Sequence, residues 1–269
     1  MKIAALQTVS GTSVAANLEA ARGLLAQAAA GGAELAVLPE YFCLMGQRDR
    51  DKLEARERFG DGPIQSFLAQ QARALRLWIV GGTLPLVADS AEHVRNTSLA
   101  FSPAGTCVAR YDKVHLFKFD NGREQYDESR VIEAGGVPQS FTLPSRDGHG
   151  WRIGMSVCYD LRFPELYRRL GADLLLVPSA FTHPTGEAHW ELLLRARAVE
   201  NLAYVCAPAQ GGRHENGRRT WGHSMVVDPW GAVLAERRED GAGMVFADLD
   251  AARLAQVRAQ LPALDHRKL

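Results

Sequence analysis

The hydrophobic residues of this chain follow two different periods, and the switches between them predict alternating strands and helices. Short apolar runs typical of buried strands cover residues 2–6, 34–38 and 77–80. Between these runs, residues 13–29 and 62–75 place hydrophobic positions three and four apart, which is typical of an amphipathic helix. The first third of the chain therefore predicts a sheet whose strands are joined by covering helices.

The rest of the chain continues this alternation but places more strands in succession. Helical spacing recurs over residues 164–170, 187–200 and 250–260. Further strand-like runs cover residues 97–101, 107–111, 152–157, 173–177, 203–207, 223–228, 232–235 and 244–247. A turn signal at residues 228–231 (DPWG) joins two of the later runs. The whole pattern predicts an α/β fold with a mixed sheet.

The composition favours one domain without a polyanionic partner. No linker or long run of like charge divides the 269 residues, so we expect a single domain over residues 1–269. The 31 Lys and Arg residues balance the 31 Asp and Glu residues, and the net charge of +0 gives no attraction for nucleic acid or an anionic membrane. No apolar run approaches the roughly 20 residues that span a bilayer, and the run after Lys2 is too short for a secretion signal. We therefore expect a soluble protein.

The cysteines and histidines give no sign of a metal site or a disulfide framework. The four cysteines lie far apart, with no C-x-x-C pair, at Cys43, Cys107, Cys158 and Cys206. Free thiols suit a reducing compartment, so we expect the protein in the cytoplasm. The eight histidines include no H-E-x-x-H pattern, and we expect neither a bound metal nor a cofactor.

Cys158 is the strongest candidate for a nucleophile. It follows an apolar strand-like run and precedes a proline-started helical turn, where unpaired backbone N–H groups favour developing negative charge. The competing interpretation is a small buried hydrophobic residue, which is the common fate of a lone cysteine. Ser156 is a rival, because residues 154–158 differ by one residue from the G-x-S-x-G elbow of serine hydrolases. Strand alternation puts both side chains on the same side, so the residue at the strand end is better placed to enter a cleft.

Glu40 and Lys113 could supply the other groups that a thiol needs to open an amide. Both residues lie just beyond strand-like runs, and sites in open α/β sheets gather at strand ends. A carboxylate can carry the thiol proton to the leaving nitrogen, while an ammonium favours the thiolate and the oxyanion. Taken alone, each residue is more often a solvated surface charge.

Three segments together resemble the signature segments of the nitrilase, or carbon–nitrogen hydrolase, superfamily, and they occur in the same order. They are residues 38–42 (LPEYF), 111–116 (YDKVHL) and 157–166 (VCYDLRFPEL). The resemblance extends over nearly the whole chain, including residues 178–181, 185–190 and 222–231. It implies a four-layer αββα sandwich with mixed sheets, formed when two protomers pack their sheet-covering helices together. A homodimer or higher homo-oligomer without a cofactor is therefore expected.

The same resemblance implies a catalytic triad. In it, Glu40 is the general base and acid, Lys113 is the electrostatic partner, and Cys158 is the nucleophile that forms a thioester.

The resemblance also implies a second glutamate between the lysine and cysteine segments. Glu128 is the best match, while Glu124 is a competing candidate and a merely solvated loop is a further alternative. The backbone N–H of Tyr159 is expected to join the lysine at the oxyanion, because it directly follows the nucleophile.

Three further residues are candidates for binding the substrate. Arg162, one turn beyond the nucleophile, could bind a substrate carboxylate through two parallel hydrogen bonds, and the resemblance points the same way. The alternative is a local salt bridge to Asp160 or Glu165. Phe181 and Thr182 are expected to form a wall of the pocket, although an aromatic residue there is as easily part of the core.

Together these features predict an amidase that hydrolyses the carboxamide of a small carboxylated metabolite and releases an amine or ammonia. Residues 209–225 resemble the branch that repairs deaminated glutathione more than the ω-amidase branch acting on α-ketoglutaramate. Glu187 replaces a proline common to both branches, which puts the edge of the pocket in question. Nitriles and N-carbamoyl amines are alternative substrates, because a thioester mechanism does not itself choose the leaving group. A catalytically silent binding scaffold is an alternative of a different class.

Overall fold

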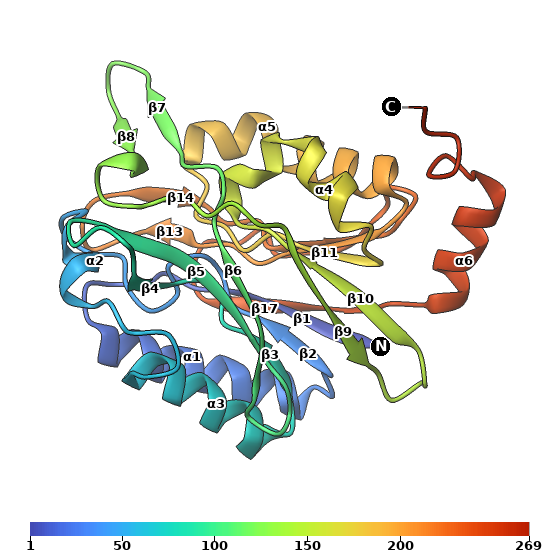
Figure 1. Cartoon of the computed structure of the whole chain (residues 1–269), viewed down its shortest axis with the longest axis horizontal. Coiled ribbons are helices and arrows are strands. Elements are labelled where there is room, and N and C mark those ends of the chain that lie inside the picture. Colours follow the sequence, from blue (N-terminus) through green and yellow to red (C-terminus); the bar gives the residue numbers. More distant parts are fainter. Residues whose placement is uncertain (269) are drawn as a thin grey trace.

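Two large β-sheets lie face to face in the computed structural model, which describes residues 1–268 (Figure 1). The first sheet has the strand order β17-β1-β2-β3-β5-β4, with β6 paired to β5. Its strands are β1 (Lys2–Gln7), β2 (Leu35–Val37), β3 (Trp78–Val80), β4 (Leu84–Val87), β5 (Val94–Phe101), β6 (Cys107–Asp112) and β17 (Gly243–Asp248). The neighbours β1, β2 and β3 run parallel, whereas β17 and β5 run antiparallel to the strands beside them. Leu269, at the end of the expected domain, lies outside the described residues.

The second sheet repeats this plan, with the strand order β16-β15-β12-β11-β10-β9. Its strands are β9 (Gln139–Pro144), β10 (Gly150–Met155), β11 (Leu174–Leu176), β12 (Tyr204–Ala207), β15 (Met225–Val227) and β16 (Val233–Glu236). Here β10, β11 and β12 are the parallel strands. Two short hairpins stand apart from both sheets and consist of β7 (Lys118–Asp120) with β8 (Gln125–Asp127), and β13 (Gly211–Arg213) with β14 (Arg219–Trp221).

Helices cover the outer face of each sheet (Figure 1). The first sheet is covered by α1 (Val14–Ala30) and α3 (Pro63–Leu75), and the second by α4 (Pro164–Leu170) and α5 (His183–Asn201). The remaining helical elements are the single turn α2 (Asp51–Glu54), the lateral helix α6 (Ala251–Gln260), and the 3-10 helices η1 (Glu128–Arg130) and η2 (Cys158–Arg162).

The central strands are apolar on both faces because both faces are buried. On β1, Ile3 belongs to the core that contains Ile153 of the second sheet, whereas Ala4 packs in the core of α1 and α3. Since successive side chains of a strand point to opposite faces, one strand contributes to two cores. This explains why such strands read as continuous apolar runs instead of alternating ones.

The expected αββα sandwich with mixed sheets is confirmed, but one chain supplies all four layers. The expectation that two protomers must combine to form the sandwich is wrong, because both sheets and both helix layers belong to the same chain (Figure 1).

Most expected elements are present, and the main boundary error lies at α5. This helix begins at His183, four positions before the expected start, because Pro184 is well tolerated in a first helical turn where no N–H bond is needed. Gly186 in the same turn packs against Trp221, where an added Cβ would lie 2.2 Å from the Trp221 Cβ. Several elements were not expected from the sequence, and they include α2, η1, β4, β7, β8, β9, β13 and β14. Most of these are short strands or single turns, whereas β9 has six residues.

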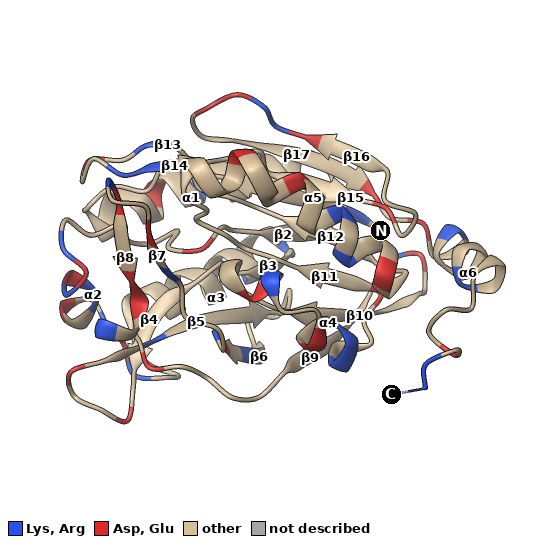
Figure 2. Cartoon of the chain, turned by 90° about the horizontal axis from the view of Figure 1, so that it is seen from above, with Lys and Arg blue, Asp and Glu red and all other residues tan. Residues whose placement is uncertain are grey.

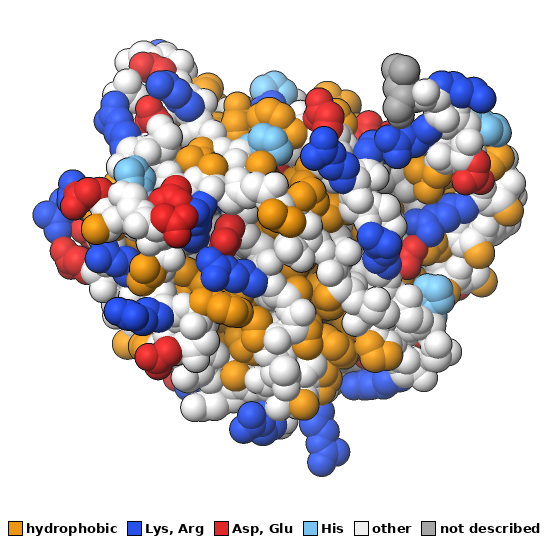
Figure 3. All heavy atoms as spheres, in the orientation of Figure 1, with side chains coloured by type: hydrophobic (Ala, Val, Ile, Leu, Met, Phe, Trp, Pro, Cys, Tyr) orange, Lys and Arg blue, Asp and Glu red, His pale blue; other side chains and the backbone are white. Residues whose placement is uncertain are grey.

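Charged residues of both signs are interspersed over the molecule. Figure 2 shows basic and acidic positions alternating along neighbouring elements, in keeping with the net charge of +0. Figure 3 shows hydrophobic side chains reaching the surface between them, in the middle of this face and at its top over α5. Within residues 1–268, no helix combines the length and apolar character needed to cross a bilayer.

Candidate active site

The loops after three strands meet at one place and carry the three candidate catalytic residues. Glu40 follows β2, Lys113 directly follows β6, and Cys158 begins η2 after β10. The Nζ of Lys113 donates a hydrogen bond of 2.9 Å to Oε1 of Glu40. Cys158 lies close enough to both for their charges to shift its pKa. The structure therefore brings together all three residues that the sequence singled out.

The carboxylate of Glu40 is buried and held by three donors. Its Oε1 accepts from Lys113 and, at 2.9 Å, from Nδ2 of Asn96 on β5, while its Oε2 accepts from the N–H of Ala180 at 2.9 Å. The backbone before Glu40 is packed so closely that a Cβ on Gly82 would lie 1.9 Å from the Pro39 carbonyl oxygen. Glu40 is consequently fixed in position, as a proton carrier needs to be.

Lys113 also contacts a second carboxylate, that of Glu128 on η1. Its Nζ donates to both carboxylate oxygens of Glu128, at 3.0 and 2.8 Å. Glu128 further accepts from the Tyr41 hydroxyl and from the Phe117 N–H, both at 2.7 Å. Glu124, the competing candidate, lies in the turn between β7 and β8, so Glu128 is the candidate that faces the lysine.

The two carboxylates determine the charge state of Lys113. Burial would lower the pKa of this ammonium, but Glu128 and then Glu40 more than offset that effect and hold the pKa well above its ordinary value. In return, the pKa of Glu128 is lowered, because the nearby Lys113 charge and hydrogen bonds outweigh the raising effect of burial. The site thus contains a charged Lys113 and a charged Glu128 at neutral pH.

In contrast to Lys113 and Glu128, the Cys158 thiol is held in its neutral form. Burial raises its pKa well above the ordinary value, the Glu40 carboxylate raises it further, and Lys113 offsets only part of this. The resting thiol is therefore protonated at neutral pH. It can become a nucleophile when its proton passes to a neighbouring carboxylate during attack.

The backbone at the nucleophile is strained and held in place by Asp160. Cys158 has a φ of 51°, in the left-handed region that non-glycine residues seldom adopt. The buried carboxylate of Asp160 accepts from the Tyr111 hydroxyl, the Val157 N–H, and both the N–H and Nδ1 of His115, at 2.7, 2.8, 3.0 and 2.7 Å. These bonds tie the turn that presents the thiol to the strand that precedes Lys113.

The Tyr159 N–H directly follows the candidate nucleophile in the chain. It is the second N–H of η2, and the first, that of Cys158, is bonded to the Pro178 carbonyl at 3.0 Å. Within the described part of the chain, no acceptor is bonded to the Tyr159 N–H. It is therefore free to donate to a developing negative charge.

Ser156 does not face this site. Its hydroxyl is buried and bonded to the Tyr167 hydroxyl of α4 at 2.8 Å and to the Leu176 carbonyl at 2.7 Å. The expectation that Ser156 and Cys158 share one side is wrong, because β10 ends at Met155 and the left-handed turn at Cys158 breaks the alternation.

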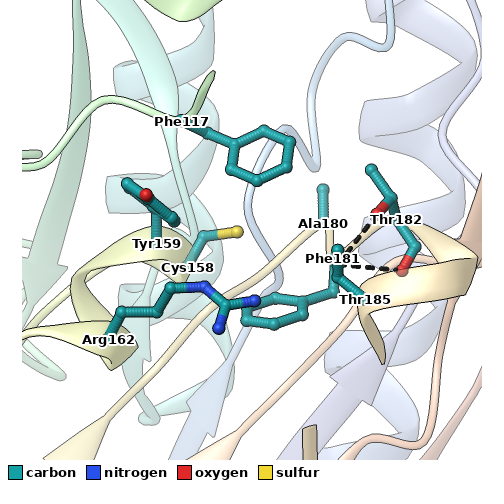
Figure 4. A pocket seen from close by; sticks show the side chains of 8 residues that line it. All are labelled: Phe117, Cys158, Tyr159, Arg162, Ala180, Phe181, Thr182 and Thr185. Carbon is teal, nitrogen blue, oxygen red and sulfur yellow. Dashed lines mark hydrogen bonds between the residues drawn. The ribbon is translucent and has the colours of Figure 1, made fainter. Parts of the chain in front are cut away.

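All four candidate substrate-binding residues line a pocket with Cys158 (Figure 4). The complete lining is Phe117, Cys158, Tyr159, Arg162, Ala180, Phe181, Thr182 and Thr185. Figure 4 shows Phe117 and Arg162 on opposite sides of the sulfur. Phe181 also packs on Trp190, so it is both a pocket wall and a core residue. The cavity is about 10 Å³, which is room for roughly one water molecule.

Arg162 does not form the local salt bridge that was the alternative to substrate binding. Its guanidinium donates to Nδ1 of His189 at 3.1 Å and lies over the rings of Tyr159 and Phe181. Asp160 is already bonded to other groups, and within residues 1–268 Arg162 pairs with no carboxylate. The guanidinium is therefore available to a substrate anion. Glu187 is exposed and does not line the pocket.

Sequence analysis did not identify several residues that complete the site. Asn96 and Tyr41 contact the two glutamates, and Gln210 donates from Nε2 to the Glu40 carbonyl at 3.0 Å. Tyr41 directly follows Glu40 in the LPEYF segment, and this position was the one sequence feature that could have identified it. Its backbone has a φ of 57°. Asn96 and Gln210 are distant in sequence and polar in otherwise apolar strand regions. Among the described residues, no group of three or more His, Cys, Asp or Glu side chains could hold a metal.

Known proteins resemble this chain in sequence and in fold. The sequence model of the carbon–nitrogen hydrolase family matches residues 2–259. The chain is 42% identical to the deaminated glutathione amidase of Synechocystis sp., over 98% of this chain and 97% of that protein. It superposes on the crystal structure of the Caenorhabditis elegans NitFhit protein with a TM-score of 0.88 and 38% identity, covering 99% of this chain and 65% of that longer one. An amidase of Nesterenkonia sp. AN1, with acrylamide added at its active-site cysteine, gives a TM-score of 0.79 at 28% identity, covering 97% and 98% of the two chains.

Replacing Glu40 with Gln should lower the pKa of Cys158. After burial, the Glu40 carboxylate is the largest effect that raises this pKa, and glutamine removes its charge while keeping its shape. The rate at which iodoacetamide modifies Cys158, followed by peptide mass spectrometry, rises as pH approaches the thiol pKa. That rise should move to lower pH by about one unit or more in Glu40→Gln. Glu187→Gln, at an exposed carboxylate, is the control, and an unchanged or upward-shifted profile for Glu40→Gln would contradict the assignment.

Replacing Asp160 with Asn should destabilise the protein. The carboxylate now accepts hydrogen bonds from four donors. The asparagine amide has an NH₂ group in place of one oxygen, so at least one of these donors would face another donor and remain unpaired in the interior. We expect the free energy of unfolding in urea to fall by about 2–4 kcal/mol. Asp265→Asn, at an exposed position, should change it by less than about 0.5 kcal/mol. Equal stabilities of the two variants would show that Asp160 does not hold this turn.

Proposed function

Since the chain belongs to the carbon–nitrogen hydrolase family, we propose that Glu40, Lys113 and Cys158 carry out amide hydrolysis through a thioester. The family match and the amidase relatives make the chain an enzyme that acts on carbon–nitrogen bonds of amides. The observation that supports these residue roles best is the buried contact of Lys113 with Glu40 and Glu128 beside the Cys158 thiol.

The first half-reaction opens the amide. The sulfur of Cys158 attacks the carbonyl carbon as its proton passes to Glu40, and a carbon–sulfur bond forms. The negative charge on the carbonyl oxygen is stabilised by the Lys113 ammonium and the Tyr159 N–H. Glu40 then gives the proton to the leaving nitrogen, the carbon–nitrogen bond breaks, and an amine or ammonia departs. Glu128 serves to hold Lys113 charged and in place.

The second half-reaction releases the acid. A water molecule attacks the thioester while Glu40 takes one of its protons, and the same two donors stabilise the second oxyanion. The carbon–sulfur bond breaks, the carboxylic acid leaves, and the thiol of Cys158 recovers a proton from Glu40. The sum is one amide and one water converted to one acid and one amine, so no cofactor is required.

The substrate we propose is a small carboxylated amide, deaminated glutathione. Deaminated glutathione amidases of several organisms are 36–42% identical to this chain over at least 94% of its length. In that compound an amide joins an α-keto diacid to cysteinylglycine, so the released amine is cysteinylglycine. Arg162 and its pocket, with Phe181 and Thr182 as a wall, would bind the keto-acid carboxylate. The cavity of about 10 Å³ must widen for this, and movement of Phe117 or Arg162 would do so.

We also propose that the protein is a cytoplasmic, single-domain homodimer whose protomers meet along α5. Leu192 and Val199 are exposed seven positions apart on one face of this helix, at 68% and 44%. Val199 lies beside Gly231, and the adjacent Trp230 is 54% exposed. These exposed apolar side chains lie on both sides of Arg195, whose Nε donates to the Gly231 carbonyl, and exposed apolar side chains gathered on one face mark an interface. A domain over residues 1–269 agrees with the family match over residues 2–259, and the free state of all four cysteines suits the cytoplasm.

Hydrolysis by the purified enzyme tests the proposed reaction. The chain should hydrolyse deaminated glutathione, and Cys158→Ala should lower kcat/KM by about a thousandfold or more because it removes the attacking sulfur. Ser156→Ala is the matched control and should retain activity within about threefold. Release of amine or ammonia from a panel of amides, nitriles and N-carbamoyl amines separates the substrate classes. Activity on nitriles or carbamoyl compounds alone, or undiminished activity of Cys158→Ala, would disprove the proposal.

Replacing Trp230 with Glu should separate the protomers. A charge placed in the centre of an apolar interface is costly to desolvate, so the equilibrium should shift toward monomer by about tenfold or more in the dissociation constant. Sedimentation velocity over a range of concentrations measures this. Val87→Glu, at a similarly exposed position on β4, should sediment like the unaltered protein. A monomeric unaltered protein, or a Trp230→Glu variant that stays dimeric, would refute this interface.

A further inference from the structure

A second pocket adjoins the Cys158 pocket on the other side of Phe117. Phe117 lines both pockets, and Glu128, which contacts Lys113, also lines the second one. The full lining of the second pocket is Tyr41, Asp49, Lys52, Phe117, Tyr126, Asp127, Glu128, Val131, Ile132 and Arg218. These residues come from the loop after β2, from α2 and the segment before it, from the β7–β8 hairpin with η1 and the residues that flank them, and from the turn of the β13–β14 hairpin. None of them belongs to the proposed catalytic triad.

Two of the three carboxylates of this pocket have cationic partners that lie outside its lining. Glu128 is bonded to Lys113, and Asp127 pairs with Lys118 at 3.2 Å. The third carboxylate is that of Asp49. Its Oδ1 lies 3.6 Å from Nζ of Lys52, and the Asp49 side chain is 66% exposed. The acidic residues therefore do not leave the pocket with unbalanced negative charge.

The two cations of the pocket are Lys52 and Arg218, and neither is firmly paired. Lys52 is only 8% exposed, lies 5.0 Å from the centre of the Tyr41 ring, and has Asp49 as a loose partner. Arg218 lies 4.7 Å from the centre of the Tyr126 ring, and its guanidinium contacts the Met45 sulfur at 3.6 Å. Within the part of the chain described here, no carboxylate oxygen lies within 4 Å of Arg218.

Lys52 and Arg218 line the same pocket. Burial lowers the pKa of Lys52, Asp49 and Glu128 oppose this effect, and the Arg218 charge adds to it. Two like charges that converge on one partly dehydrated pocket repel each other until an anion lies between them. A carboxylate bound there would relieve the repulsion and gain charge-assisted hydrogen bonds from both residues.

We propose that Lys52 and Arg218 form a second carboxylate subsite, which binds the end of the substrate across Phe117 from Arg162. The inference rests on the proposed function, and it specifies the substrate class as linear amides with a carboxylate on each side of the scissile bond. Deaminated glutathione has this form, since its keto-acid carboxylate and its glycine carboxylate lie on opposite sides of the amide. A primary amide such as α-ketoglutaramate lacks the second carboxylate. The two cationic positions thus account for selection of the longer substrate.

A matched pair of substrates tests this subsite. The pair is deaminated glutathione and its glycinamide analogue, which differ only in the far carboxylate. The enzyme should have at least about tenfold higher kcat/KM for the carboxylate form, because each charge-assisted hydrogen bond to it is lost in the analogue. Lys52→Met and Arg218→Gln should each reduce this preference to about threefold or less, mainly through KM for the carboxylate form. Arg218→Lys should restore part of it, since the charge returns without the planar fork.

The control variant is Arg219→Gln, which removes the neighbouring exposed arginine of the same hairpin and should keep the full preference. If the unaltered enzyme hydrolyses both substrates equally well, or if Lys52→Met and Arg218→Gln keep its preference, the subsite is refuted while the proposed function stands. If the enzyme hydrolyses neither substrate, the proposed function itself fails, and the subsite with it. Because the measure is a ratio within each variant, a general loss of folded enzyme does not mimic the expected result.

Discussion

The buried ammonium of Lys113 is the interaction on which the site depends. It lies between the carboxylates of Glu40 and Glu128; Lys113 and Glu40 are buried, and the Glu128 side chain is 14% exposed. Burying one of these charges alone would cost several kcal/mol, so each requires the others. Burial and the Glu40 carboxylate keep the Cys158 thiol protonated at rest, and the same carboxylate is a proton acceptor beside it. The same contacts therefore stabilise the charges of the site and position the groups that the reaction needs.

The fold brings these charges together by joining two similar sheets. Glu40 follows a parallel strand of the first sheet and Cys158 follows a parallel strand of the second, so the two meet where strand ends converge. Two residues at this junction, Tyr41 and Cys158, adopt left-handed backbone conformations. Such strain persists only where surrounding bonds over-determine it, as those of Asp160 do here. The rigid sheets thus hold a turn that would not be stable alone.

The sequence predicted the parts of this arrangement that depend on local pattern. Apolar runs and helical spacing located the central strands and covering helices, and the signature segments located Glu40, Lys113 and Cys158. It could not predict the short hairpins, whose few polar residues have no periodic pattern and are fixed by pairing with distant partners. Nor could it predict that Asn96 bonds Glu40, or that Lys52 and Arg218 converge, because such contacts arise only from the folded chain. Strand alternation misplaced Ser156, since one left-handed residue ends it.

Mass spectrometry of the enzyme quenched during turnover tests the central claim most directly. With an amide substrate in excess, acid quenching and peptide mapping should find the acyl group of the substrate attached to Cys158. A folded Lys113→Met variant should carry no such adduct, because the thiol then lacks the ammonium that stabilises the oxyanion. An unmodified Cys158 during rapid turnover, an acyl group on a different residue, or full acylation of Lys113→Met would contradict the account.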